Sequence, residues 1–313
     1  MLITVQRGTP PTDHEVMMLG LALRILDGRP RSLGRRRGAA SAGRVSPVLA
    51  DLEDVLRKPT AALKDAALWR GDDERYWHTV DPLLRTLRAM ADDGGLGEVF
   101  ARPSEVPIDR ARPVVFDLSG VHESDTRLRA AVLLACWTVG FGAIAVSHAL
   151  ADAGLEPRRT YVAVMDELWS ALRAGTGLVD RVDSLGRLNR DKGVGTIMVS
   201  HTMDDLKALP TEQDRSKAAG LVERAGVLIC AGLPQSEMER LAGVARFTER
   251  EQAELVSWST PPTWSSTSTA RPPGQGKFLI KVGGRPGIPF ELVLTPAEEA
   301  LNNTNKRWTV GAR

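Results

Sequence analysis

The chain has 313 residues, of which 42% are hydrophobic, so it can bury the core of one large domain with a smaller one appended. Lys and Arg number 41 against 39 Asp and Glu, and this balance means that total charge gives no argument for a nucleic-acid partner. Cys136 and Cys230 both lie in apolar runs, which argues against a disulfide framework and favours a reducing cytoplasm. The first ten residues, MLITVQRGTP, lack the pattern of an export signal.

Residues 1–45 are expected to form an N-terminal strand and helix followed by a basic loop. LITVQ has the composition of a short strand, and apolar periodicity predicts a helix over Glu15–Leu26. Arg29–Arg44 is rich in Gly, Ser and Arg without apolar periodicity. Two interpretations of this loop stay open, a solvated linker or a contact with DNA phosphate or an acidic partner.

Residues 46–110 have a helical pattern and predict a small helical lobe that ends at Gly- and Pro-containing segments. Over residues 111–258, apolar runs rich in Val and Ile alternate with helical stretches. This alternation predicts an α/β core, a mostly parallel sheet flanked by helices. The predicted strands are PVVFDLS (113–119), TYVAVMDE (160–167), GVGTIMVS (193–200) and GVLICAG (226–232).

Residues 130–151 carry no formal charge over a length that could cross a bilayer. The segment lies between two predicted strands and contains Gly140, Gly142, Ser147 and His148. This context favours a helix packed on the sheet over a membrane span.

Residues 259–313 begin with a connector rich in Pro, Ser and Thr. Two alternating runs, KFLIKVG and PFELVLT, then predict a β-hairpin. The last predicted element is a helix in TPAEEAL, where Thr295 and Glu298 have the spacing of a capping box.

The strongest chemical signal is TYVAVMDELW, in which an apolar strand ends in the adjacent carboxylates Asp166 and Glu167. Ligands bind at the carboxyl ends of the strands of an open parallel sheet. In phosphate-loop enzymes the first acid of such a pair holds Mg²⁺, usually through water, and the second polarises the attacking water. The pair therefore predicts a Walker B site with Asp166 as the metal ligand and Glu167 as the catalytic carboxylate; an ordinary solvated strand end is the alternative.

Further polar and basic side chains are expected at the same edge of the sheet. Ser200 and His201 close the run VGTIMVS, where a polar group could sense the γ-phosphate of ATP. Arg187, Arg190 and Lys192 lie in GRLNRDKGVG and are candidates for the cation that stabilises the transferring phosphoryl group. Ordinary helix-terminal cations and a loop or capping histidine are the alternative interpretations.

The phosphate-binding half of such a site has no counterpart in the sequence. No G-x-x-x-x-G-K-S/T motif occurs, and the nearest string, PPGQGKF, has Phe278 in place of the hydroxyl residue. Without that loop the β- and γ-phosphates lack their backbone cradle and lysine. No zinc spacing, Ser-His-Asp arrangement or dinucleotide fingerprint replaces it.

Taken in order, these motifs resemble the C-terminal half of the TraC/VirB-type conjugative-transfer ATPases of type IV secretion systems, in the HerA and FtsK superfamily. The resemblance implies a RecA-like core in a motor that binds ATP and Mg²⁺. It also implies that the motor assembles as an oligomer, expected to be a hexamer, and works with inner-membrane components on the cytoplasmic side. The family usually has Gln where His201 stands. The resemblance rests on VLADLEDVL (48–56), PVVFDLSGV (113–121), Asp166-Glu167-x-Trp169, LNRDKGVGTIMVSHTMDDL (188–206) and the closing run GKFLIKVGGRPGIPFELVLTPAEEALNNTNKRW (276–308).

Three functions remain open from the sequence. The first is the C-terminal part of a motor ATPase that hydrolyses ATP only when it is joined to a phosphate-loop partner or is present in the full-length chain. The second is a non-catalytic structural subunit of a secretion complex. The third, a nucleic-acid-binding accessory protein, would use the basic loop Arg29–Arg44.

Overall fold

The computed structural model describes residues 1–28, 47–92, 96–103, 108–180, 182–184, 193–260 and 273–302. In these residues the chain is mixed α/β and divides into two compact units. Unit 1 comprises residues 1–200 and 208–215, and unit 2 comprises residues 201–207 and 216–313. The boundary falls inside the stretch 111–258 that the sequence suggests as one core, and the four-part division of the chain stays a prediction.

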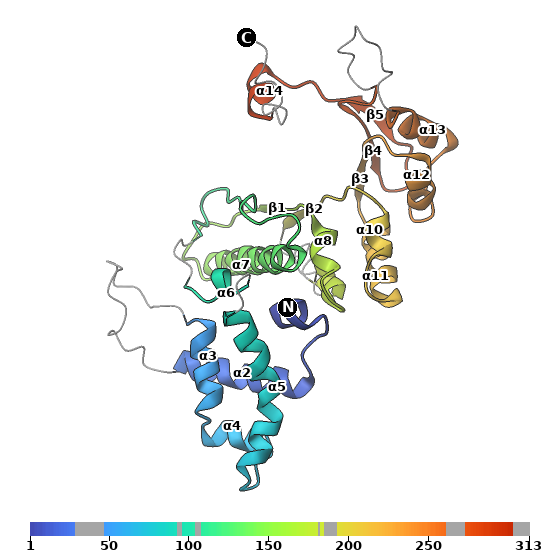
Figure 1. Ribbon diagram of the computed structural model, residues 1–313. Coiled ribbons are helices and arrows are strands. Elements are labelled where there is room, and N and C mark those ends of the chain that lie inside the picture. Colours follow the sequence, from blue (N-terminus) through green and yellow to red (C-terminus); the bar gives the residue numbers. More distant parts are fainter. Residues whose placement is uncertain are drawn as a thin grey trace, which may run out of the picture. The chain divides into compact units, whose positions relative to one another are not determined.

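The N-terminal part of unit 1 is helical. LITVQ is not a strand, as its composition suggests, but part of helix α1, whose buried Ile3, Thr4 and Val5 are consecutive. A short apolar run fits a buried helix as well as a strand, and here contacts with α5 and α7 favour the helix. The helices of this part are α1 (Leu2–Arg7), α2 (Asp13–Gly28), α3 (Leu49–Arg57), α4 (Ala61–Ala66), α5 (Asp73–Asp92) and α6 (Leu96–Phe100), which Figure 1 shows in blue and teal.

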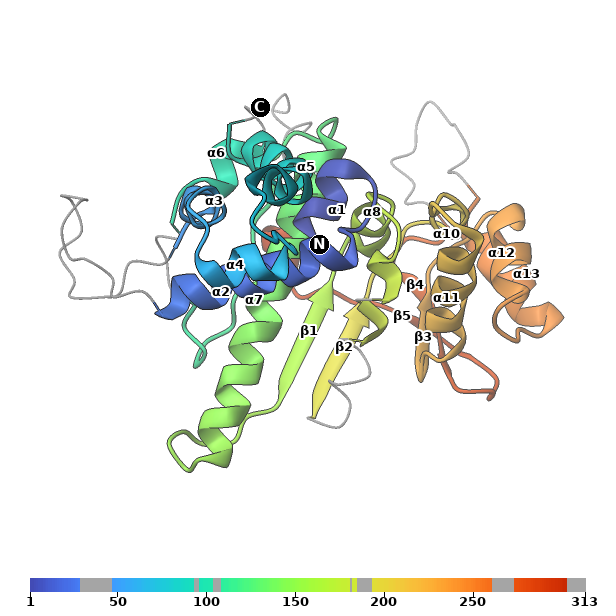
Figure 2. The ribbon, with the colours of Figure 1, turned by 90° about the horizontal axis from the view of Figure 1, so that it is seen from below.

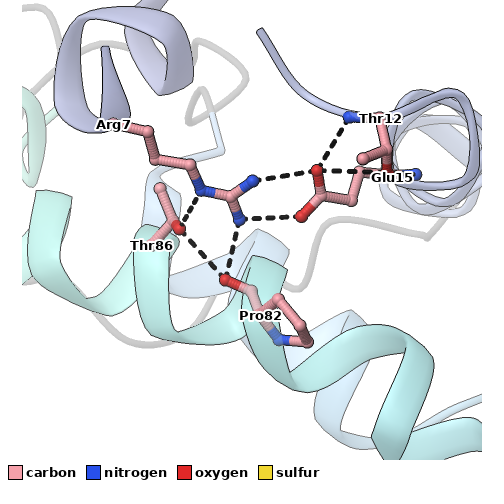
Figure 3. A network of polar contacts seen from close by, with 5 residues as sticks. All are labelled: Arg7, Thr12, Glu15, Pro82 and Thr86. Atoms are coloured by element: carbon pink, nitrogen blue, oxygen red, sulfur yellow. Dashed lines mark hydrogen bonds and ion pairs between the residues drawn. The ribbon is translucent and has the colours of Figure 1, made fainter. Parts of the chain in front are cut away.

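A polar network joins three of these helices (Figure 3). The Arg7 guanidinium at the end of α1 donates two hydrogen bonds to the Glu15 carboxylate of α2, at 2.7 and 2.9 Å. It also donates to the Thr86 hydroxyl at 2.5 Å and to the Pro82 carbonyl at 2.8 Å, both on α5. The hydrogen bonds from Arg7 outweigh burial and lower the pKa of Glu15. The network therefore fixes α1 and α2 against α5.

Helix α7 (Thr126–Asp152) lies alongside a two-stranded parallel sheet of β1 (Tyr161–Met165) and β2 (Val194–Met198), seen in Figures 1 and 2. Among the described residues, α7 is the helix whose length and apolar composition would allow a membrane crossing, and 33% of its most apolar window is buried. Its buried residues lie near its two ends, at 130–134 and 147–148. The middle of the helix is only partly covered.

The predicted strand PVVFDLS is wrong. Residues 113–118 make no β-ladder, and Asp117 and Ser119 instead form a turn in which the Ser119 N–H donates to the Asp117 carboxylate at 2.9 Å. Val115 is 88% exposed, so this stretch lacks the burial that would favour a sheet strand. The parallel sheet of the described residues consequently has two strands.

Unit 2 contains a second sheet, and its strands are antiparallel, in the order β3 (Val227–Cys230), β4 (Lys277–Val282), β5 (Ile288–Glu291). The strand predicted in GVLICAG is present as β3, but it pairs antiparallel with β4, so its assignment to a parallel sheet is wrong. The reason is that a continuous apolar run gives no information about the direction of its neighbour. The predicted hairpin is confirmed as β4 and β5.

Helices α12 (Gln235–Ala242) and α13 (Glu249–Trp258) cover one face of this sheet. The core between them consists of Met238 of α12, Leu255 of α13, Cys230 of β3 and Leu279 of β4, among other residues. The remaining helices are α10 (Asp204–Lys207), α11 (Glu212–Glu223), which runs from unit 1 into unit 2, and α14 (Pro296–Asn302). The predicted capping box of α14 is confirmed, because the Glu298 N–H donates to the Thr295 hydroxyl and the Thr295 N–H donates to the Glu298 carboxylate.

Candidate functional site

The carboxylate pair lies in a sharp turn between strand β1 and helix α8 (Leu168–Leu172). Met165, the last residue of β1, is 2% exposed, and Leu168 and Leu172 of α8 are fully buried. Between these anchors Asp166 is exposed and Glu167 is half-buried. The buried flanks therefore hold both acids at the surface of unit 1, at the carboxyl end of the strand.

Glu167 has a left-handed backbone, with φ of 53° and ψ of 29°. Residues with a Cβ atom seldom adopt this conformation, which costs about 1–2 kcal/mol. The Glu167 N–H donates to the Asp166 carboxylate at 3.0 Å, so the two acids are also tied to each other. Strain of this kind persists where the surrounding structure imposes it, and it is frequent at functional sites.

Strand β2 brings a third predicted residue to the same edge. Met165 pairs in register with Met198, and the Val199 N–H donates to the Met165 carbonyl at 3.0 Å, so pairing continues past the strand. Ser200 follows directly and is exposed. The strands β1 and β2 run parallel side by side (Figure 2). Asp166 and Ser200 come after the carboxyl ends of these two strands, so they lie at the same edge of the sheet.

The described structure does not place the other four predicted site residues beside Asp166, Glu167 and Ser200. Arg187, Arg190 and Lys192 lie outside the described residues. His201 is described, but it is the first residue of unit 2, whereas Asp166, Glu167 and Ser200 belong to unit 1. Three of the seven predicted residues are thus shown together at one sheet edge.

The side chains at this edge are suited to Mg²⁺ that is bound mainly by water and phosphate. They are not suited to a metal ion bound only by protein side chains. Among the described residues, no group of three or more His, Cys, Asp or Glu side chains could hold a metal ion. One or two carboxylates are what Mg²⁺ uses in a protein when water and phosphate oxygens complete its shell. The exposed Asp166 is therefore compatible with a metal–nucleotide complex.

Two residues without a prediction from the sequence, Glu237 and Arg240, position the segment after His201. The Glu237 carboxylate on α12 accepts a 2.6 Å hydrogen bond from the Met203 N–H and also pairs with Arg240. Arg240 pairs in addition with Asp204 at 2.8 Å. Burial raises the pKa of Glu237, but its hydrogen bonds prevail and lower it. The i, i+3 spacing of Glu237 and Arg240 is a signal for the pair; their link to residues 203–204 depends on tertiary structure.

No protein-family model and no curated protein matches the chain. Among solved structures it is similar to VirB4 of Thermoanaerobacter pseudethanolicus, with a TM-score of 0.60 over 92% of this chain. The chain has the fold of VirB4. The sequence identity is 17%, and the chain spans 66% of the VirB4 chain. The resemblance to TraC/VirB-type proteins noted from the sequence is confirmed at the level of the fold.

Proposed function

We propose that the chain forms the Walker B half of the nucleotide site of a type IV secretion motor ATPase with a RecA-like core. One observation carries this proposal. Asp166 and Glu167 directly follow β1, and Ser200 follows the parallel neighbour β2, in a chain with the fold of VirB4. The carboxyl edge of the strands is where a parallel α/β sheet binds its ligand.

The two acids would have different roles. Asp166 is exposed and would hold Mg²⁺ through water, and the bound ion would neutralise charge on the phosphates of ATP. Glu167 would orient and polarise the attacking water, and its backbone conformation sets the direction in which its Cα–Cβ bond leaves the chain. The Ser200 hydroxyl would contact the γ-phosphate.

The remaining predicted residues complete this proposal. His201 would sense the state of the γ-phosphate, and Glu237 and Arg240 would hold the segment that follows it. Arg187 and Arg190 would stabilise the transferring phosphoryl group, with Lys192 as a further phosphate contact.

The phosphate-binding loop would come from outside these 313 residues, on a partner or in a longer chain, since they contain no G-x-x-x-x-G-K-S/T sequence. One face of the β1–β2 sheet supports this, because Val162, Val164 and Ile197 on it are 69, 61 and 51% exposed. Parallel sheets are normally covered on both faces. As the family resemblance of the sequence implies, the assembly would be a hexamer at the cytoplasmic side of the inner membrane, bound to other secretion components. Arg29–Arg44 would be its DNA contact.

The test is ATP turnover by the chain combined with a second polypeptide that carries the phosphate-binding loop. We expect hydrolysis in the combination, because neither part alone holds both the phosphates and the attacking water. Glu167→Gln should lower turnover by about 10²–10⁴-fold, the usual contribution of a positioned general base, while ATP binding stays.

Glu212→Gln is the matched control, since Glu212 is an exposed carboxylate on α11 outside the β1–β2 edge. It should leave turnover unchanged. Full hydrolysis by the Glu167→Gln variant would remove Glu167 from the catalytic role. If the combination binds no ATP, the chain is instead a structural subunit of the secretion complex.

A further inference from the structure

The helical part of unit 1 has an open groove of about 490 Å³ on its surface, between α3 and α5. The buried Tyr76 hydroxyl of α5 donates to the Leu56 carbonyl of α3 at 2.7 Å, and this hydrogen bond fixes the two helices to each other. The groove shares no residue with the Asp166 edge or with the β1–β2 sheet. Its six lining residues are Arg57 of α3 and Trp77, Asp81, Leu84, Arg85 and Arg88 of α5.

Glu53 of α3 holds two arginines of the groove in place. Its carboxylate pairs with Arg57, one turn further along α3, at 2.6 Å and with Arg88 of α5 at 3.2 Å. The Glu53 side chain is only 16% exposed, whereas the side chains of Arg57 and Arg88 are 42 and 54% exposed. Since one carboxylate neutralises only one of the two cations, these arginines present one excess positive charge to solvent.

Two further charged groups of the groove are unpaired. Among the described residues, neither the Arg85 guanidinium nor the Asp81 carboxylate has a hydrogen-bond or ion-pair partner. Asp81 is half-buried, so its carboxylate has lost part of its hydration without a compensating donor. A carboxylate can only accept hydrogen bonds and a guanidinium can only donate them. The groove therefore offers an unused acceptor and an unused cation one helical turn apart.

The groove also contains an exposed aromatic ring. Trp77 is 37% exposed, and the buried Tyr76 ring packs against it in a T-shaped arrangement with centroids 5.1 Å apart. Trp77, Asp81 and Arg85 are spaced four residues apart, so they lie along one face of α5 over a length of about 12 Å. An aromatic ring, an acceptor and a cation therefore follow one another in a row.

We propose that this groove binds one nucleotide of a single-stranded nucleic acid, with guanine as the favoured base. The base would stack on Trp77, and its N1–H and N2 amino group would donate to the Asp81 carboxylate. The phosphates on either side would lie at Arg85 and at the Arg57–Arg88 pair. An acidic peptide suits the groove less well, because Asp81 would repel its carboxylates and it offers no flat ring to Trp77.

The test uses the whole chain without ATP, so its result does not depend on the proposed Walker B site. The probe is a fluorescein-labelled strand of nine nucleotides, all thymidine except a central guanosine, and fluorescence anisotropy gives its affinity. The same strand with a central inosine, whose base lacks the N2 amino group, should bind about tenfold more weakly. Free guanosine monophosphate should compete at least about 100-fold more weakly than the strand, because it brings a single phosphate. Equal competition by guanosine monophosphate or by oligoglutamate would overturn the proposal.

Asp81→Asn tests the contact with the base. The substitution keeps the size of the side chain and removes a charge that has no partner among the described residues, so the Tm without nucleic acid should stay equal or rise. The preference for guanine over inosine should fall to under about twofold, because the carboxylate that accepts both donors is gone. A preference that persists in this variant would show that Asp81 does not contact the base.

A pair of arginine variants on α5 gives a matched control for the phosphate contact. Arg85 lines the groove, whereas Arg75 is exposed on the same helix, outside the groove, and pairs with Asp72. Arg85→Gln should reduce the slope of log affinity against log salt concentration by about 0.7, the value for one phosphate of a single strand, and Arg75→Gln should leave it unchanged. Trp77→Leu should weaken binding by at least about fivefold through the loss of stacking. Equal slopes for the two arginine variants would show that the strand binds elsewhere, and the proposal would be wrong.

Discussion

At the scale of single residues, Glu167 is the position where the backbone and the proposed chemistry meet. It is one of three described residues with a Cβ atom and a positive φ, together with Leu68 and Arg70. The left-handed turn lets the chain pass from the exposed Asp166 directly into the buried helix α8. The turn therefore places the Glu167 carboxylate at the end of β1 at a cost in local stability.

This conformation predicts a stability change that is independent of any nucleotide. Glu167→Gly should raise the free energy of unfolding of unit 1 by up to about 1 kcal/mol, because glycine adopts a positive φ without a Cβ clash. Glu167→Ala is the control, since it removes the carboxylate but keeps the Cβ atom, and it should not stabilise. Urea unfolding measures both. Equal effects of the two substitutions would show that the backbone at Glu167 is unstrained.

The identity of the acidic pair could be predicted from the sequence, whereas its setting could not. An apolar run ending in Asp-Glu is visible in one segment of the chain, so Asp166 and Glu167 were accessible to pattern reasoning. The left-handed φ of Glu167 and the pairing of Val199 with Met165 depend on contacts between distant segments. The contacts of Glu237 and Arg240 with residues 203 and 204 were missed for the same reason.

At the scale of elements, a buried ion pair joins helix α13 to the β4–β5 hairpin. Lys281 and Glu251 have side chains only 5 and 7% exposed and lie 2.8 Å apart. Glu251 also accepts hydrogen bonds from the N–H groups of Thr248 and Gly287, and Lys281 donates to the Arg285 carbonyl at 3.2 Å. The pair thus fixes the hairpin turn against the helix.

Breaking this pair from one side should be costly. Lys281→Met leaves the Glu251 charge buried and unpaired, so the free energy of unfolding of unit 2 should fall by about 3–5 kcal/mol. Lys277→Met makes the same substitution on the same strand at a partly exposed site and should cost under about 1 kcal/mol. Denaturant melts of the two variants provide the comparison; similar midpoints would contradict the importance of the pair.

The same pair sets an acid dependence. Burial raises the pKa of Glu251, but hydrogen bonds from Lys281, Gly287 and Thr248 prevail and lower it to about 2, from an ordinary value of 4.5. A carboxylate with a lowered pKa stabilises the fold fully above its unfolded pKa, and this contribution is lost as the pH falls. Unit 2 should therefore lose stability between about pH 4.5 and 2, and Glu251→Gln should flatten that slope in acid unfolding. An unchanged slope would exclude Glu251 as the cause.

Helices were easier to predict than strand partners. Periodicity and capping patterns located α2, α7 and α14, because these signals lie within one segment. LITVQ and PVVFDLS failed because a short apolar run is a strand only where a neighbour pairs with it. For β3 the element was right and its direction was wrong, since strand direction is a property of the pair.

At the scale of the whole chain, the likeness to VirB4 depends on several features, each of which alone would be weak evidence for a fold. A two-stranded parallel sheet, a three-stranded antiparallel sheet and a helical N-terminal part together match one known fold over 92% of the chain at 17% identity. Sequence matching alone finds no family model or curated protein. Fold therefore gives the likeness its support, and the proposed chemistry depends on the residues at the end of β1.

The most direct measurement of the central claim is the Mg²⁺ dependence of ATP affinity for the chain combined with a phosphate-loop polypeptide. With Asp166 as the metal ligand, Mg²⁺ should tighten ATP binding, and Asp166→Asn should reduce that gain by about 10–100-fold while binding of ATP without Mg²⁺ stays the same. A variant whose Mg²⁺ gain equals that of the natural sequence would show that Asp166 holds no metal, and the Walker B account of this chain would be wrong.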